Sequence, residues 1–552
     1  MNGMDGRNAH KRALVTAHSS ARISGLASHP DNPFQFCSVA DDHSVRIYDA
    51  KQHQLLRMSQ MDTSGRCCGY SPDGQMVVIG LGSAELDGKV PEKKEGAFLV
   101  LSEEDLTIVF EMRDSKKAIV SCSFSPNQEL IALASLDGIV YLYHSRDCTP
   151  KAKCKGHSGG VTHIDFSTDS RFLMTNSQTG ELLFWLVDTG ELLPPRSVRD
   201  VSWETNSCVF SLDTQGFWTT GGTEHNMCCA SHASDLIAAV DAFGRIKLMS
   251  FPALRNESNF NVLKGHGANI KNCCFSSDDS FLFTSGGSDG AIIQWRVSMP
   301  VTQSTAGNPK NDLIQAALAS ELNFEGTALD RNAAFFFAVN DHPLPTFNFE
   351  EDPLAAAPLS LWQRAIVAPS QLPPINDFSE PLDSLELSYV YGFSVDKSRQ
   401  SLLYAVDGDA VFLSGSIVVK MNPTSRKQRY YLEHTATLTA LAIHPLESSN
   451  IIASGQVGEL AEIRIWNASS LQTLFVVAGY HKKAINHLQF SLDGSLLVTV
   501  GMDSLHSVAV YDWRNETIIS CSNGFANKSL AISFFPDAKT LIHCGNEIIR
   551  FW

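Results

Sequence analysis

The 552-residue sequence lacks the features that define several large classes of protein. It has no apolar run close to the roughly 20 residues of a membrane span, and its opening, MNGMDGRNAHKR, lacks the apolar core of a signal peptide. Basic residues are few: 43 Lys and Arg face 59 Asp and Glu, a formal charge of −16. Nucleic acid and anionic lipid both need clustered cations. We therefore expect a soluble cytoplasmic protein that binds neither nucleic acid nor membrane.

The 13 cysteines contain no CxxC pair and no regular spacing, so they do not predict a disulfide framework or a zinc site. Three doublets occur, Cys67-Cys68, Cys228-Cys229 and Cys273-Cys274. Adjacent residues of a strand point to opposite faces, so each doublet places at most one thiol in a given core. We interpret these cysteines as small buried apolar residues.

Catalytic motifs are also missing. There is no glycine-rich phosphate loop ending in Lys-Ser/Thr, no GxSxG and no HExxH. We therefore predict no catalytic residue, no cofactor and no metal site. Hydrophobic residues make up 43% of the chain and charged residues 18%, which is enough apolar material for a sizeable core and excludes a mainly disordered or fibrous protein.

The sequence does contain a repeat. Residues 265–297 read GHGANIKNCCFSSDDSFLFTSGGSDGAIIQWRV, and residues 156–187 read GHSGGVTHIDFSTDSRFLMTNSQTGELLFWLV. Weaker copies lie at 21–50, 118–144, 437–467 and 484–513. Each copy has short alternating apolar strands separated by Ser-Pro-Asp-Gly-like turns. A period of roughly 40–50 residues with GH…W ends is typical of WD40 propeller blades, so we predict an all-β fold of tandem propellers.

In the 265–297 copy, His266, Ser285, Asp289 and Trp295 match the WD40 pattern in which these side chains hydrogen-bond within a blade. A His–Asp pair also invites a catalytic interpretation. Other copies have lost parts of the pattern. For example, the copy at 21–50 has Tyr48 at the position that corresponds to Trp295. Packing tolerates such variation and catalysis does not, so we interpret the network as structural.

The repeats divide the chain into three parts. About six units fill residues 17–297, a near-complete propeller. Residues 298–384 break the pattern and are predicted to be a connector, with a helix-like NDLIQAALASEL and an apolar AAFFFAV. About four units fill residues 385–552, which end at EIIRFW on an aromatic strand. Because a propeller must close, we interpret the chain as a piece of a longer repeating protein. The alternative is that a partner or second copy closes the second ring.

The order of these parts resembles one family. The segments RDVSWETNSCVFSLDTQGFW and DAFGRIKLMSFP, followed by the 265–297 repeat, are similar to the end of the second propeller in echinoderm microtubule-associated protein-like (EML) proteins. Residues 385–422, LELSYVYGFSVDKSRQSLLYAVDGDAVFLSGSIVVKMN, resemble that family's HELP segment, with Ser388-Tyr389 where the family has a charged residue and Trp. Residues 361–374 resemble the linker before HELP. This order implies a long, multi-unit member: the second propeller of one tandem unit, then HELP and the first blades of the next.

The resemblance also implies a function. It indicates a non-enzymatic cytoskeletal protein that binds tubulin or microtubules through its propellers and modulates microtubule organisation, in the cytoplasm or in a ciliary axoneme. Microtubule surfaces are acidic, so a chain at −16 needs local cations to dock. The candidate contacts are Lys93, Lys94, Lys151, Lys153, Lys155, Arg426, Lys427, Arg429, Lys482 and Lys483.

Two other classes stay open. The first is a WD40 interaction scaffold or substrate adaptor that does not bind tubulin, because fold alone does not fix the partner. The second is a propeller enzyme with its chemistry at the central channel, which would need repeated ligands that this sequence does not supply.

Overall fold

The computed structural model describes residues 13–18, 22–83, 94–217, 225–254, 260–287, 289–298, 361–367, 369–370, 381, 383–393, 401–446, 449–459, 461–525, 529–535 and 540–552. Apart from short 3-10 turns, the regular elements in these ranges are strands, which confirms the predicted all-β fold. Within the same ranges no helix has the length and apolar character to cross a membrane. The candidate Lys93 and both segments noted in the connector lie outside the described residues.

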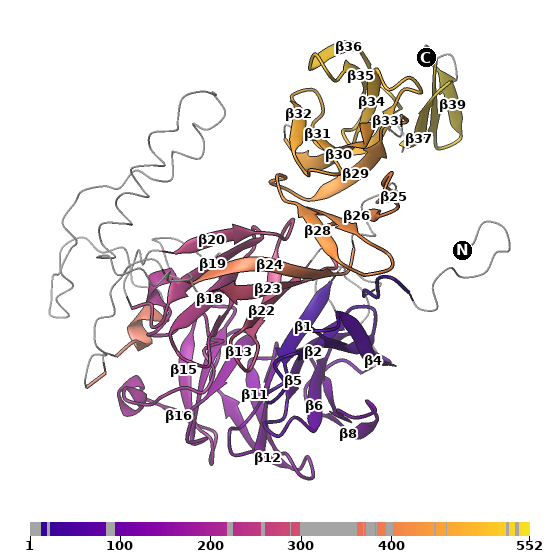
Figure 1. Ribbon diagram of the computed structural model, residues 1–552. Coiled ribbons are helices and arrows are strands. Elements are labelled where there is room, and N and C mark those ends of the chain that lie inside the picture. Colours follow the sequence, from indigo (N-terminus) through magenta and orange to yellow (C-terminus); the bar gives the residue numbers. More distant parts are fainter. Residues whose placement is uncertain are drawn as a thin grey trace, which may run out of the picture. The chain divides into compact units, whose positions relative to one another are not determined.

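The described residues up to Tyr391 form six antiparallel sheets of four strands each (Figure 1). The first three sheets are β1 (Ile23–Ser28), β2 (Gln35–Ala40), β3 (Ser44–Asp49), β4 (Gln54–Gln60); β5 (Gly65–Tyr70), β6 (Met76–Leu81), β7 (Ala97–Ser102), β8 (Ile108–Arg113); and β9 (Ile119–Phe124), β10 (Leu130–Ser135), β11 (Ile139–His144), β12 (Pro150–Lys155). The other three are β13 (Val161–Phe166), β14 (Phe172–Ser177), β15 (Leu182–Leu186), β16 (Glu191–Leu193); β17 (His225–Ala230), β18 (Leu236–Asp241), β19 (Arg245–Ser250), β20 (Asn261–Lys264); and β21 (Ile270–Phe275), β22 (Phe281–Gly286), β23 (Ile292–Ser298), β24 (Ser384–Tyr391).

The first strand of each sheet lies on the inner side and carries a β-bulge near its start. The register shifts between Ile23 and Gly25 in β1, between Gly65 and Cys67 in β5, and at matching places in the other four sheets. A bulge increases the local twist. Neighbouring inner strands also approach closely: a Cβ on Gly25 would lie 2.9 Å from the Cα of Cys67. Glycine is therefore required where β1 passes β5.

Hydrophobic clusters between successive sheets close the ring. Between the last sheet and the first, Phe36 lies 4.5 Å from Phe283 and Tyr48 lies 5.4 Å from Tyr391, measured between ring centroids. These contacts leave no free sheet face at the junction, as closure of a propeller requires. Cys67 and Cys68 pack into two different inter-sheet clusters, as the alternation of strand side chains predicts.

An irregular segment lies between the fourth and fifth sheets. Within its described residues it has no strand, only the 3-10 turns η1 (Pro195–Val198) and η2 (Gln215–Phe217). The buried carboxylate of Asp165 organises it, accepting hydrogen bonds from Thr205 Oγ1 (2.6 Å) and from the backbone N–H of Cys208 (2.8 Å). A third turn, η5 (Gln363–Ala365), follows Trp362, which is buried in the same cluster as Phe217.

The outer strand of the sixth sheet comes from beyond the connector. Strand β24 pairs with β23 along its whole length, from Ile292 opposite Tyr391 to Ser298 opposite Ser384, and Figure 1 draws the two side by side. The sequence placed residues 385–391 at the start of the second propeller, whereas the structure places them in the last sheet of the first. The physical reason is that β23 would otherwise present an unpaired edge. Tyr389, at the departure from the HELP pattern, stacks on His53 with ring centroids 3.9 Å apart.

The remaining strands form four further sheet units. They are β25 (Leu402–Tyr404), β26 (Ala410–Ser414), β27 (Ile417–Met421), β28 (Gln428–Tyr431); β29 (Leu438–Ile443), β30 (Ile451–Gly458), β31 (Ile463–Asn467), β32 (Thr473–Val477); β33 (Lys483–Phe490), β34 (Leu496–Gly501), β35 (Val508–Asp512), β36 (Thr517–Ser522); and β37 (Ser529–Phe534), β38 (Leu541–Gly545), β39 (Ile548–Phe551). The second and third units are joined through two residue pairs, Val457 with Ala484 and Gly458 with Lys483. The inner-strand bulge recurs in β29, β33 and β37, so these units repeat the blade pattern of the first set.

Candidate functional site

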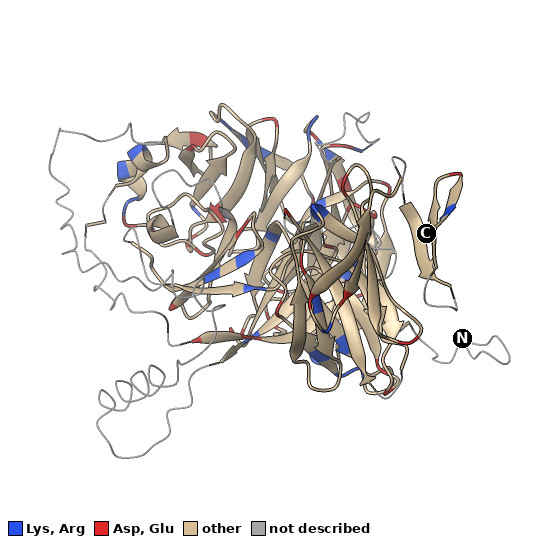
Figure 2. Ribbon diagram, turned by 90° about the horizontal axis from the view of Figure 1, so that it is seen from above, with Lys and Arg blue, Asp and Glu red and all other residues tan. Residues whose placement is uncertain are grey.

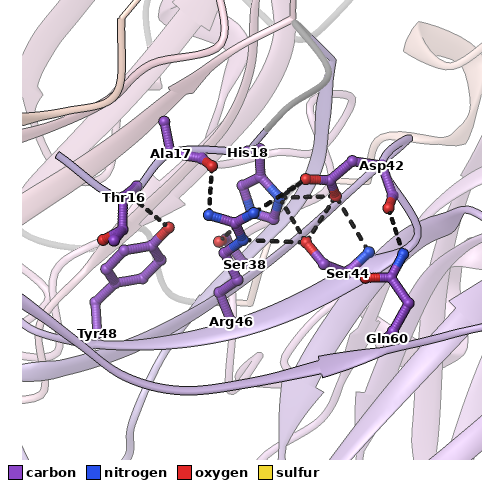
Figure 3. Close-up of polar contacts among 9 residues, drawn as sticks. All are labelled: Thr16, Ala17, His18, Ser38, Asp42, Ser44, Arg46, Tyr48 and Gln60. Carbon is purple, nitrogen blue, oxygen red and sulfur yellow. Dashed lines mark hydrogen bonds and ion pairs between the residues drawn. The ribbon is translucent and has the colours of Figure 1, made fainter. Parts of the chain in front are cut away.

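The first blade contains a buried polar network that could be mistaken for an active site (Figure 3). His18 Nδ1 lies 3.0 Å from Asp42 Oδ1, and His18 Nε2 lies 2.8 Å from Ser38 Oγ. Ser44 Oγ donates to Asp42 Oδ1 at 2.7 Å, and Arg46 Nε donates to Ser44 Oγ at 3.1 Å. Asp42 is an acceptor, so Nδ1 of His18 carries the proton and Nε2 accepts from Ser38. The network holds the segment before β1 against β2 and β3.

Two contacts at the edge of Figure 3 extend this attachment. The Tyr48 hydroxyl lies 3.5 Å from the carbonyl oxygen of Thr16, and Gln60 Nε2 donates to the carbonyl oxygen of Asp42 at 2.8 Å. Arg46 Nη1 also donates to the carbonyl oxygen of Ala17. Residues 16–18 are thereby bonded to β2, to β3 and to the turn between them, and Gln60 of β4 bonds the same turn.

The 265–297 repeat carries the same network with one change from the sequence interpretation. His266 Nδ1 lies 2.8 Å from Asp289 Oδ2, and His266 Nε2 lies 2.9 Å from Thr284 Oγ1. Trp295 Nε1 donates to Thr284 Oγ1 at 3.0 Å. The hydroxyl expected from Ser285 is therefore supplied by Thr284, because successive residues of β22 face opposite sides. Ser285 instead accepts from Asn272 Nδ2 at 3.3 Å.

Three other blades contain the same histidine network with different partners. His157 contacts Glu181 (3.0 Å) and Thr175 (2.7 Å), His434 contacts Gln456 (2.8 Å) and Ser454 (2.7 Å), and His481 contacts Ser507 (2.9 Å) and Thr499 (2.5 Å). The acidic partner of the histidine is thus replaced by an amide in one blade and by a hydroxyl in another. A proton relay would lose its base at these positions, whereas a network that only satisfies buried polar groups does not.

The histidine side chains of these networks are largely buried. His18, His266 and His434 are each 3% exposed and His481 is 1% exposed. Burial lowers the pKa of His434 and of His481 to about 4, and it also lowers the pKa of His18 and of His157. No group of three His, Cys, Asp or Glu side chains within the described ranges is arranged to hold a metal ion.

The lowered pKa values predict destabilisation by acid. An unfolded histidine has a pKa near 6.5, so the unfolded state binds more protons than the folded state below that pH. Stability is therefore present above pH 6.5 and is lost as the pH falls toward 4. We expect the free energy of unfolding to fall by about 2–3 kcal/mol for each of His434 and His481 between pH 7 and pH 4.5.

Urea titrations at both pH values measure this loss. The variant His434→Gln is expected to reduce the pH dependence, while His144→Gln, at an exposed position of β11, leaves it unchanged. A pH dependence that is identical in His434→Gln and the unaltered chain would contradict the assignment.

The cationic candidates lie in separate places and differ in availability. Lys and Arg are dispersed among Asp and Glu in Figure 2. On strand β12, Lys151 pairs with Asp188 (2.9 Å) and Lys153 lies 3.4 Å from Asp114, while Lys155 is exposed. Lys94 contacts Asp62 and Glu111, both at 2.8 Å. Local acids therefore compensate the charges of Lys94, Lys151 and Lys153.

The C-terminal candidates have no carboxylate partner that the structure places within ion-pair distance. Arg426 Nη2 donates to the carbonyl oxygen of Ala13 (3.3 Å) and Arg429 Nη1 to that of Ser469 (3.1 Å). Lys427, Lys482 and Lys483 are exposed. The Arg426–Arg429 group thus keeps a net positive charge at the turn before β28.

One polar junction escaped the sequence interpretation. The side-chain amide of Gln428, on β28, donates to the carbonyl oxygen of Val390 and accepts from its N–H, both at 3.0 Å. The Tyr430 hydroxyl donates to the carbonyl oxygen of Ser388 at 2.9 Å. The outer edge of β24 is therefore covered by two side chains of β28. No repeat pattern signals this junction, because its partners lie about 40 residues apart in different sheets.

Comparisons with known proteins place this architecture. A family model of the echinoderm microtubule-associated protein second β-propeller matches residues 23–297, and a model of the first β-propeller of the same family matches residues 427–552. Mouse echinoderm microtubule-associated protein-like 3 is 33% identical over 292 residues, covering 51% of this chain and 31% of the relative. Rat echinoderm microtubule-associated protein-like 2 is 31% identical over 292 residues, covering 52% of this chain and 43% of the relative. This chain thus spans less than half the length of either relative.

Among solved structures, a chain in a crystal structure of the mitotic checkpoint complex is similar with a TM-score of 0.40 and 14% identity, covering 52% of this chain and 94% of that one.

The two family models together match more than half of the 552 residues and fall on both sets of sheets. The chain therefore belongs to the echinoderm microtubule-associated protein family, with a domain like the family's second propeller preceding one like its first.

Proposed function

We propose that this chain is a non-enzymatic cytoskeletal module that binds tubulin or microtubules in the cytoplasm. The observation that carries the proposal is the match of both sheet sets to propeller models of a family whose relatives are named as microtubule-associated. The burial of the blade histidines supports a binding role over a catalytic one.

The proposal extends to the parts of the chain. Residues 17–297 act as the second propeller of one tandem unit, residues 298–384 as its connector, and residues 385–552 as the HELP segment and the first blades of the next unit. The pairing of β24 with β23 supports a direct attachment between these units, because one strand of the HELP segment completes a sheet of the preceding propeller.

Docking on an acidic polymer depends on local cations that are not already neutralised. With a formal charge of −16, the chain as a whole is repelled by such a surface. The Arg426, Lys427 and Arg429 group is the strongest of the candidates, because it joins three cations with no carboxylate in ion-pair distance among the described residues, whereas Lys482 and Lys483 are two and Lys151 and Lys153 have acidic partners.

Co-sedimentation with assembled microtubules across a salt series tests the proposal. The unaltered chain is expected to pellet at low salt and to be released as salt screens the contacts. Neutralising Arg426, Lys427 and Arg429 to glutamine is expected to weaken low-salt binding by about tenfold, because rim charges act through long-range attraction.

The matched control is the triple change of Lys94, Lys151 and Lys153 to glutamine. It removes the same three charges at positions that acids already compensate, so binding is expected to change less. Equal effects of the two triple variants would show that only total charge matters and would remove the Arg426–Arg429 group. Absence of pelleting, together with no shift of soluble tubulin on sizing, would favour an interaction scaffold that does not bind tubulin.

A further inference from the structure

The irregular segment between the fourth and fifth sheets forms one wall of a cavity of about 630 Å³. Residues within 195–213 line one side, and residues 365–367, 369 and 370, at and beyond the end of η5, line another. Two attachments hold the second wall in place. Trp362 is buried and stacks on Phe210, with ring centroids 5.5 Å apart. Ser370 donates its backbone N–H and its hydroxyl to the carboxylate of Asp200, at 2.7 and 2.6 Å.

Two side-chain oxygen acceptors belong to residues that line this cavity. Asn206 is 9% exposed, and its Oδ1 is buried without a hydrogen-bond partner in the described chain. Asp213 lines the same cavity with its side chain partly exposed. Buried acceptors are rarely left unsatisfied, and a carboxylate in a poorly hydrated cavity is stabilised by a counter-ion. Both residues therefore favour a ligand that donates hydrogen bonds and carries positive charge.

The loop that carries Asp213 is fixed. Its backbone carbonyl accepts from the N–H of Ala253 at 2.9 Å, and the N–H of Gly216 donates to the carbonyl of Ala253 at 2.7 Å. Thr214 Oγ1 accepts from the N–H of Ser211 (3.0 Å) and donates to the carbonyl of Val209 (2.8 Å). The backbone that carries the Asp213 side chain is thus held in place beside the cavity.

Aromatic side chains also line the cavity. Phe184 and Trp203 lie 5.9 Å apart with their rings nearly parallel, and Phe251 lies on the same cavity. Aromatic faces attract cations, and they pack well against the methylene stem of a basic side chain. A neutral ligand could donate hydrogen bonds to Asp213 and Asn206 but would not compensate the charge of Asp213, and an anion would be repelled by it.

We propose that this cavity binds an alkylammonium group, such as the side chain of a lysine from a protein partner, with Asp213 as its counter-ion and Asn206 Oδ1 as a hydrogen-bond acceptor. The stem of the lysine packs on Trp203 and Phe251. The site is distinct from the cationic groups considered for microtubule docking, because it selects a basic ligand. Its test does not depend on microtubule binding.

The proposal includes a pH dependence. Burial raises the pKa of Asp213 to about 6, so the free site loses its charge as the pH falls through 6. The other charged residues that line the cavity are Arg199 and Asp200, which lie 3.3 Å apart as an ion pair. The hydrogen bonds from Ser370 lower the pKa of Asp200, so this carboxylate stays ionised at pH 5. The remaining lining residues are uncharged.

Ligand-observed NMR and calorimetry on the full chain test the proposal with three probes: Nα-acetyl-lysine N-methylamide, its uncharged norleucine analogue, and n-butylammonium. The lysine probe is expected to bind at least about tenfold more tightly than the norleucine probe at pH 7.5. Its affinity is expected to fall by about tenfold at pH 5.0, because a group with a pKa near 6 is then about one-tenth ionised. n-Butylammonium carries the same alkylammonium group and is expected to bind with similar affinity, whereas an affinity no better than that of the norleucine probe would overturn the proposal.

Two variants complete the design. Asp213→Asn is expected to weaken the lysine probe at least about tenfold and to abolish the pH dependence. Glu204→Gln removes one charge from an exposed position of the same segment that does not line the cavity, and is expected to leave binding unchanged. Absence of binding at 10 mM probe, equal binding of the norleucine probe, or retained binding in Asp213→Asn would each overturn the proposal.

Discussion

Replacing Asp213 with asparagine is expected to raise the free energy of unfolding at pH 7.5 by about 1–3 kcal/mol. The pKa of this carboxyl is raised in the folded chain from its usual 3.8 to about 6 by burial. The folded state therefore binds a proton more tightly than the unfolded state, and the ionised carboxylate destabilises the fold above pH 6. Asparagine has nearly the same shape without the charge.

The gain has a characteristic pH range. It is fully present above pH 6, decreases as the pH falls from 6 toward 3.8, and disappears below both values. Urea unfolding of the variant and the unaltered chain at several pH values measures it, with the exposed Glu204→Gln as the control. A variant that is less stable than the unaltered chain at pH 7.5 would mean that Asp213 has a partner within the fold. Retention of a carboxylate that costs stability is expected where it serves binding.

Replacing Tyr391 with alanine is expected to destabilise the first set of sheets by about 3–5 kcal/mol. Tyr391 is 5% exposed on β24, its hydroxyl donates to Gln294 Oε1 at 2.8 Å, and its ring contacts Phe36 and Tyr48 of the first sheet. Truncation removes the ring that fills the junction between the last sheet and the first. It also leaves Gln294, which is 1% exposed, without this hydrogen bond.

The matched control is Tyr404→Ala. Tyr404 is the same residue type on β25, but it is 62% exposed, so its truncation is expected to cost well under 1 kcal/mol. Hydrogen exchange of β2 and β22 during unfolding identifies which set of sheets is affected. Equal effects of the two variants, or loss of protection confined to residues after 401, would contradict the assignment of β24 to the first propeller.

The repeat was informative because blade formation is largely local. Strands of one blade are neighbours in sequence, their side chains alternate between two cores, and the turns between them carry Asp and Gly. The spacing of His266, Asp289 and Trp295 was therefore sufficient to predict a network that the structure contains. Thr284 was mistaken for Ser285 because the two hydroxyls are adjacent, and only the register of β22 decides which one faces His266.

For the cationic candidates, the sequence shows the charges but not their partners. Charge runs such as Lys151 to Lys155 are visible in the sequence, but the acids that neutralise them come from other strands and loops. The same holds for Asp213 and Asn206, which carry no motif. Their significance comes from their shared place on one cavity, and this is a property of the packed chain.

The amino-acid sequence by itself determined the class of fold, the blade period and the family, because each depends on residues within one repeat or on the order of short segments along the chain. Only the tertiary structure decided that residues 384–391 complete the sixth sheet, that the cavity beside Asp213 exists, and which lysines are already paired. The physical reason is range: hydrogen bonds within a blade join residues about 10–25 positions apart, whereas the strand, the cavity and the ion pairs join segments that are farther apart in the sequence and belong to different elements of the fold.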